Sequence, residues 1–123
     1  MKVPATIAAA AAALFLTAAA PEEPAMSASD LGQLCGGTDH VSVNACRVYI
    51  LGVTQGIAVG IHMASGKSPA SRPCVPAGIS ADELEAALKK KLAALDAETG
   101  QHDAAGFIGA ALAAAFPCKG GRQ

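Results

Sequence analysis

The sequence predicts an all-α protein: a small four-helix domain with two disulfides, preceded by a cleavable signal peptide. Apolar residues recur at spacings of three and four along several segments, which is the period of helices that bury one face. No alternating pattern of useful length predicts a strand. The chain also contains four cysteines, all after an apolar N-terminal run: Cys35, Cys46, Cys74 and Cys118. An even number of cysteines in a small exported chain is typical of a disulfide framework.

Residues 1–20 have the pattern of a signal peptide. Lys2 precedes an uncharged apolar run, and small residues from Thr17 to Ala20 offer cleavage sites. An uncleaved anchor is the alternative, because the run is just long enough to span a bilayer, but its alanine-rich composition favours the signal. We expect the proline-containing residues 21–28 to be a flexible lead-in.

The domain is expected over residues 29–118, before a frayed tail at 119–123. Ser29 is the candidate N-cap of a short first helix that ends at Gly36 and Gly37. Thr38 or Asp39 can cap the long second helix. One face of that helix carries an apolar stripe: Val43, Cys46, Ile50, Val53, Ile57 and Ile61.

Three glycines recur every four residues on another face of the second helix. They are Gly52, Gly56 and Gly60, and each costs about 0.5–1 kcal/mol of helix stability relative to alanine. The favoured explanation is the close approach of a neighbouring helix or loop, and the alternative is a helix–helix dimer seam. A polar loop rich in Pro, Gly and Ser follows at residues 63–73 and carries the cations Lys67 and Arg72. Loops of this length are often functional or disordered.

The third helix has the clearest start signal in the chain. Gly78 is suited to a turn with positive φ, and Ser80 with Glu83 forms a capping box. One face of this helix is apolar, from Leu84 to Leu95, whereas the face that includes Glu85, Lys89 and Lys90 is expected to meet solvent. The helix is expected to reach Asp96 or Ala97, with Gly100 ending it.

The fourth helix is expected to begin at the N-cap Asp103 and to stop at Pro117. The residues predicted to form its buried side are Phe107, Ile108, Ala111, Leu112, Ala115 and Phe116. Consecutive helices joined by a short loop lie antiparallel, so the start of the third helix should lie near the end of the fourth. This geometry predicts Cys74–Cys118. A reversal at the two glycines then predicts Cys35–Cys46.

Composition and motifs argue against several classes of function. The formal net charge is −1 and the only basic run is Lys89–Lys91, so nucleic-acid binding has no electrostatic basis. The cysteine spacings predict no redox pair or zinc ribbon. His40, His62 and His102 lie near expected helix ends, and no catalytic motif accompanies them. We therefore expect no enzyme activity, no cofactor and no metal.

The ordered set of segments around the cysteines resembles the Rap/Tai family of immunity proteins linked to type VI secretion. The matching pieces are Leu34-Cys35, Cys46–Val53, Cys74–Ser80, Leu84, His102 with Ala104-Ala105, and Ala113–Cys118. The strongest part is the pair Cys-Val-Pro-x-Gly and Phe-Pro-Cys. The resemblance spans about residues 31–118.

This resemblance implies a periplasmic protein that binds and neutralises a secreted cell-wall hydrolase, typically a peptidoglycan amidase. It also implies a possible homodimer and no membrane association once the signal is removed. Some family members insert a loop into the hydrolase, so the candidate partner-binding residues are Ser65, Lys67, Ser68 and Arg72. The alternative function is a periplasmic structural or stress-related helical protein without a toxin partner.

Overall fold

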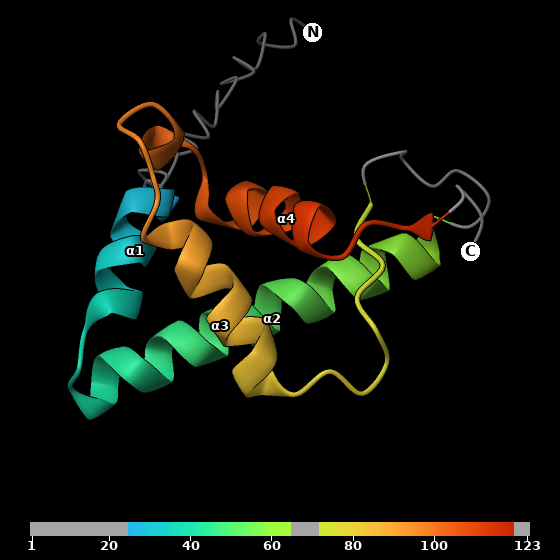
Figure 1. Cartoon of the computed structure of the whole chain (residues 1–123), viewed down its shortest axis with the longest axis horizontal. Coiled ribbons are helices and arrows are strands. Elements are labelled where there is room, and N and C mark those ends of the chain that lie inside the picture. The colour runs from blue at the N-terminus through green and yellow to red at the C-terminus, as the bar shows by residue number, and fades with distance from the viewer. Residues whose placement is uncertain (1–24, 65–71, 120–123) are drawn as a thin grey trace, which may run out of the picture.

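The computed structural model describes residues 25–64 and 72–119 and shows an all-α architecture over them (Figure 1). The elements are α1 (Ala28–Gly36), α2 (His40–Met63), α3 (Ala81–Leu92), a 3₁₀ turn η1 (Thr99–Gln101) and α4 (Ala104–Ala115). In Figure 1, α3 crosses in front of α2 and α4 lies over the C-terminal half of α2. The predicted signal peptide at 1–20 lies outside the described residues.

Helix α1 begins earlier than the sequence predicts, because Ser27 and not Ser29 is its N-cap. The Ser27 side chain accepts a hydrogen bond from the Asp30 backbone N–H, and the Asp30 carboxylate accepts one in return from the Ser27 N–H. The chain around Ser27 also pairs with the start of α4: the Ala28 N–H donates to the His102 carbonyl at 2.8 Å, and the Ala104 N–H donates to the Met26 carbonyl at 2.9 Å. These bonds fix α1 to α4 and bury Ala28 completely.

The starts of the other helices follow the sequence prediction. Asp39 caps α2, Ser80 and Glu83 form the capping box of α3, and Asp103 caps α4. Gly78 has a φ of +91°, as the turn before α3 requires.

Helix α3 ends sooner than predicted, at Leu92. The Ala94 N–H bonds to the Lys91 carbonyl and the Leu95 N–H to the Leu92 carbonyl, so the chain tightens into turns. The Asp96 carboxylate then accepts from the Thr99 N–H and supports η1 in place of another helical turn.

One apolar core joins all four helices. Its fully buried large side chains are Leu31, Ile50, Leu88, Ile108, Leu112 and Cys46. Phe107 and Phe116 pack at its edge as partly buried residues. Ala115 was predicted to be buried, but it is exposed. It is the last residue of α4.

Both disulfides pair as predicted. Cys35–Cys46 joins α1 to α2, and Cys74–Cys118 joins the segment before α3 to the segment after α4, each with a Cα–Cα distance of 5.0 Å. The Cys74 N–H also donates to the Phe116 carbonyl at 2.8 Å, which holds the same two segments together.

Glu85 corrects the prediction of a solvent-facing side of α3, because only 6% of this residue is exposed. Its carboxylate accepts from Arg47 Nε of α2 at 2.8 Å and pairs with Lys89 Nζ at 2.8 Å. Arg47 also pairs with Asp82. The hydrogen bond with Lys89, followed by the one with Arg47, holds the pKa of Glu85 below its ordinary value.

Most of α2 is not covered by the rest of the described chain. Only Cys46 and Ile50 are fully buried in it, while Val53 and Ile57 are partly buried. No other atom lies within 4 Å of where a Cβ would stand at Gly52, Gly56 or Gly60. The expected close neighbour of these glycines is therefore not found among the described residues. By length and composition alone, α2 could cross a membrane, a test that core helices also pass.

Candidate functional site

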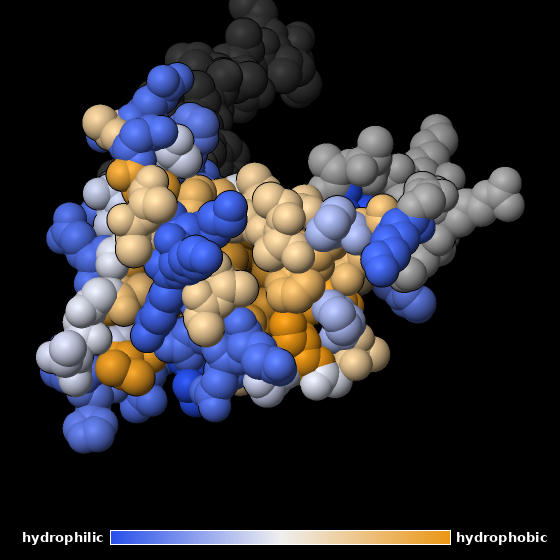
Figure 2. All heavy atoms as spheres, in the orientation of Figure 1, coloured by the Kyte–Doolittle hydropathy of each residue, from blue (hydrophilic) through white to orange (hydrophobic). Residues whose placement is uncertain are grey.

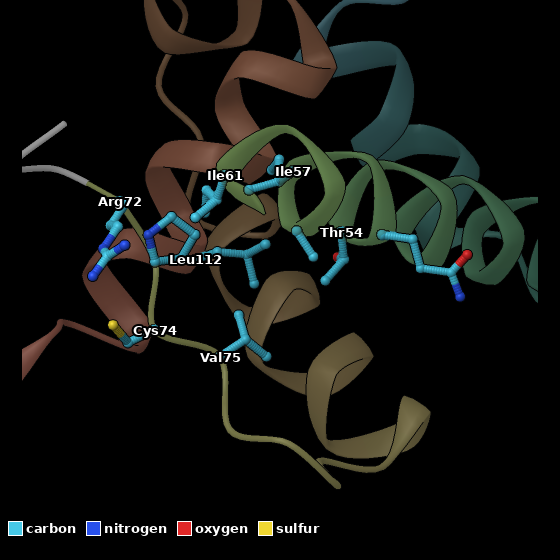
Figure 3. Close-up of a pocket in the computed structure, with 10 residues that line it drawn as sticks. Thr54, Ile57, Ile61, Arg72, Cys74, Val75 and Leu112 are labelled. Carbon is cyan, nitrogen blue, oxygen red and sulfur yellow. The ribbon is translucent and has the colours of Figure 1, made fainter. Parts of the chain in front are cut away.

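A groove of about 360 Å³ lies between the C-terminal half of α2, residues 72–75 and α4 (Figure 3). We call it the α2–α4 groove. It is lined by Thr54, Gln55, Ile57, Ala58, Ile61, Arg72, Pro73, Cys74, Val75 and Leu112. Figure 2 shows hydrophobic residues gathered over α4 and this end of α2, beside the hydrophilic surface of α3.

The interior of the groove is apolar. Ile57 and Ile61 contribute from α2, Val75 from the opposite segment and Leu112 from α4 (Figure 3). Leu112 is completely buried and is also part of the core. The groove is thus an exposed extension of the hydrophobic core, a type of surface that marks protein-binding sites when polar residues surround it.

Polar groups stand at the edge of the groove. The Thr54 hydroxyl donates to the Ile50 carbonyl of its own helix at 2.8 Å, so it presents a methyl group and a satisfied oxygen. Gln55 is exposed and Arg72 is half-buried. Arg72 brings a positive charge to this edge (Figure 3).

The wall opposite α2 is fixed by the second disulfide. Pro73 forms an isolated bridge with Pro117, and the Arg72 carbonyl oxygen lies 3.5 Å from Cys118 Sγ. Because Cys74 is bonded covalently to Cys118, residues 72–75 cannot move away from the end of α4 without distorting the two segments that the disulfide joins. The disulfide therefore shapes the groove as well as stabilising the fold.

The structure places Arg72, one of the four predicted partner-binding residues, at the edge of the groove. The other three, Ser65, Lys67 and Ser68, lie outside the described residues. Sequence reasoning missed Thr54, Gln55 and Val75. One sequence signal could have indicated the groove. The apolar stripe of α2 continues through Ile57 and Ile61, beyond the fully buried residues Cys46 and Ile50.

The three histidines and the other residues that could bind a metal are dispersed in the described part of the chain. No group of three or more His, Cys, Asp or Glu side chains is arranged there to hold a metal ion. His40, His62 and His102 are all exposed, at the start of α2, the end of α2 and the end of η1.

Comparison with known proteins gives one family and no individual relative. The family model of the Rap1a immunity proteins matches residues 27–118. No curated protein and no solved structure gives a significant match. The matched range begins at the N-cap of α1 and ends at the last cysteine, so it contains every helix and both disulfides described above. The chain belongs to the Rap1a immunity protein family.

Proposed function

We propose that this protein is a periplasmic immunity protein that binds and neutralises a cell-wall hydrolase delivered by type VI secretion. The hydrolase class that we propose is a peptidoglycan amidase. The observation that carries the proposal is the family match over residues 27–118, three quarters of the chain. Immunity proteins act by binding, so this function needs a docking surface and not a catalytic centre.

Two features of the chain support an exported site of action. Disulfides form and persist in oxidising compartments such as the bacterial periplasm, and all four cysteines are paired. The apolar pattern of residues 1–20 predicts the export signal that would take the chain there.

The docking surface that we propose combines the α2–α4 groove, which Arg72 lines, with Ser65, Lys67 and Ser68, which precede Arg72 in the sequence. An apolar groove with a cationic edge suits a partner that presents an apolar side chain flanked by carboxylates. The groove supplies buried contact area, and the charges supply orientation and a faster encounter.

Co-expression in a Gram-negative host tests the function directly. Candidate amidases would be directed to the periplasm with and without this protein, and lysis would be followed by culture density. We expect protection against at least one amidase and recovery of a complex in a pull-down of the purified pair. Lysis by every amidase despite normal periplasmic levels of this protein would contradict the proposal and favour a structural or stress-related role.

Two substitutions test the docking surface, each with a matched control. Ile61→Asp puts a charge in the groove, and Gln33→Asp makes the same new charge at an exposed site on α1. Arg72→Glu reverses the charge at the edge of the groove, and Lys90→Glu does so on the exposed face of α3. We expect the first of each pair to weaken amidase binding by about tenfold or more, the equivalent of about 1.4 kcal/mol. Equal binding by all four variants would place the docking surface elsewhere.

A further inference from the structure

The α2–α4 groove has the size and the lining of a small-molecule site. Ligand pockets in proteins typically measure about 300–1,000 Å³ and combine an apolar lining with a few polar groups. The groove measures about 360 Å³, and most of the residues that line it are apolar. Among these described lining residues, Arg72 is the only one with a charge. The groove therefore suits a slender apolar molecule that carries one negative charge.

The charge and the apolar side chains are separated along the groove. Figure 3 shows Arg72 at one end and Thr54 at the other, with Ile57, Ile61 and Leu112 between them. Leu112 is completely buried and forms the floor that the groove shares with the core. A molecule lying along the groove would thus meet apolar side chains over its length and a cation at one end.

The two ends of the groove differ in what they offer a ligand. The Thr54 hydroxyl donates to the Ile50 carbonyl of its own helix at 2.8 Å, so this end chiefly offers the Thr54 methyl group. At the other end, the Arg72 guanidinium is a group that binds carboxylates through charge-assisted hydrogen bonds. A ligand with an anionic head and an apolar tail would therefore bind in one direction, with its head at Arg72.

The backbone that carries the cation is fixed before any ligand binds. The Arg72 carbonyl oxygen lies 3.5 Å from Cys118 Sγ, and the next residue, Pro73, forms a bridge with Pro117. One residue further on, Cys74 is bonded covalently to Cys118. Because these contacts already order the main chain beside the groove, binding would not have to supply that ordering free energy.

We propose that the α2–α4 groove binds a single-chain fatty acid, with its carboxylate at Arg72 and its alkyl chain along Ile57, Ile61 and Leu112. The bound alkyl chain would cover the same apolar lining that we propose for the hydrolase. A fatty acid would therefore compete with the hydrolase and regulate its neutralisation. This competition rests on the proposed function, whereas the binding of the fatty acid does not.

A series of alkyl chain lengths tests the binding. Hexanoate, octanoate, decanoate and dodecanoate would be titrated into the protein purified from the periplasm, and the heat of binding would be measured by calorimetry. Complete burial of one methylene is worth about 0.8 kcal/mol, or about fourfold in Kd. Because the groove is open on one side, we expect about two- to fourfold per methylene, until the chain fills the groove. The stoichiometry should be one molecule per protein chain.

Substitutions locate the head and the tail of the ligand separately. Arg72→Gln should weaken decanoate binding by about fivefold or more but leave the binding of decanol, which has no charge, unchanged. Lys90→Gln, on the exposed face of α3, is the matched control and should change neither. Ile61→Asp should weaken both ligands by about tenfold or more, because it puts a charge beside the alkyl chain. Its control, Gln33→Asp, makes the same charge at an exposed site on α1.

Three results would overturn the proposal. They are no saturable binding of dodecanoate at millimolar concentration, several molecules bound per chain with no effect of Ile61→Asp, and equal decanoate affinity of the Arg72→Gln and Lys90→Gln variants.

A competition assay tests the regulation. Decanoate at about ten times its Kd should weaken amidase binding by about tenfold, because it occupies most of the grooves. Unchanged amidase affinity would overturn the competition. The titrations contain no amidase, so the two proposals can fail separately. Fatty-acid binding without protection from any amidase would contradict only the proposed function, and protection without fatty-acid binding would contradict only this inference.

Discussion

The side chain of Glu85 shows how a single residue can join two helices. Its carboxylate is nearly completely buried and is neutralised from both sides, by Lys89 one turn along α3 and by Arg47, 38 residues away on α2. Within α3 alone, Glu85 belongs to the polar face, and for this reason the sequence predicts it to be in solvent. The burial arises only because α2 packs alongside α3, which local periodicity cannot reveal.

Removing this carboxylate should destabilise the protein. We expect Glu85→Ala to lower the free energy of unfolding by about 1–2 kcal/mol, because hydrogen bonds to charged groups are lost while Arg47 and Lys89 can return to water. Lys90→Ala, on the same helix but exposed, should change it by less than about 0.5 kcal/mol. Urea denaturation at pH 7 measures both, and equal stability of the two variants would contradict this role of Glu85.

The same carboxylate should contribute to stability in a pH-dependent way. The pKa of Glu85 is lowered from its ordinary 4.5 in the folded protein, first by the Lys89 hydrogen bond and then by that of Arg47. A lowered folded pKa gives stability that is present above the unfolded value, about 4.5, and is lost as the pH falls through the folded value. Glu85→Gln should therefore lose less stability than wild type between pH 5 and pH 3. Parallel unfolding curves for the two proteins across that range would contradict the argument.

At the scale of elements, the helix starts could be predicted better than the helix ends. Asp39, Ser80 and Asp103 were identified from their side-chain chemistry, because an N-cap is a local interaction. Ser27 was missed, since the prolines before it suggested an unstructured lead-in, and its neighbours Met26 and Ala28 are held by hydrogen bonds to the distant η1–α4 connection. The end of α3 was missed because the Asp96 carboxylate accepts a hydrogen bond from the Thr99 N–H and so supports η1, a competing local structure.

The position of the α1 cap can be measured by comparing two serines. Ser27→Ala should cost about 1 kcal/mol of unfolding free energy, because it removes the hydrogen bond to the Asp30 N–H. Ser29→Ala should change stability by less than about 0.5 kcal/mol, because this exposed residue makes no capping bond. Thermal denaturation followed by circular dichroism distinguishes the two. A larger loss for Ser29→Ala would restore the original placement of the cap.

For the whole molecule, the sequence predicts the all-α class and both disulfides but not the groove. The cysteine pairs follow from topology. An antiparallel helical hairpin brings Cys74 and Cys118 together, whatever its orientation relative to the rest of the fold. The α2–α4 groove combines Ile57, Val75 and Leu112 from three separate segments, so it exists only once these segments are packed together. That packing involves the whole core, which has no local sequence signature.

The two disulfides should differ in their response to mild reductant because they differ in burial. Cys46 is completely buried and Cys35 is 7% exposed, whereas Cys74 and Cys118 are half-buried at the surface. Because exchange requires access to a sulfur atom, dithiothreitol under native conditions should open Cys74–Cys118 first. Alkylation followed by peptide mass spectrometry would identify the labelled cysteines.

Opening the Cys74–Cys118 bond, which spans 44 residues, should lower the free energy of unfolding by about 4 kcal/mol on the loop-entropy model. It should also release residues 72–75 and so weaken partner binding, while the Cys35–Cys46 bond still joins α1 to α2. Earlier labelling of Cys35 and Cys46 would show instead that α1 separates from α2 more readily than the groove opens.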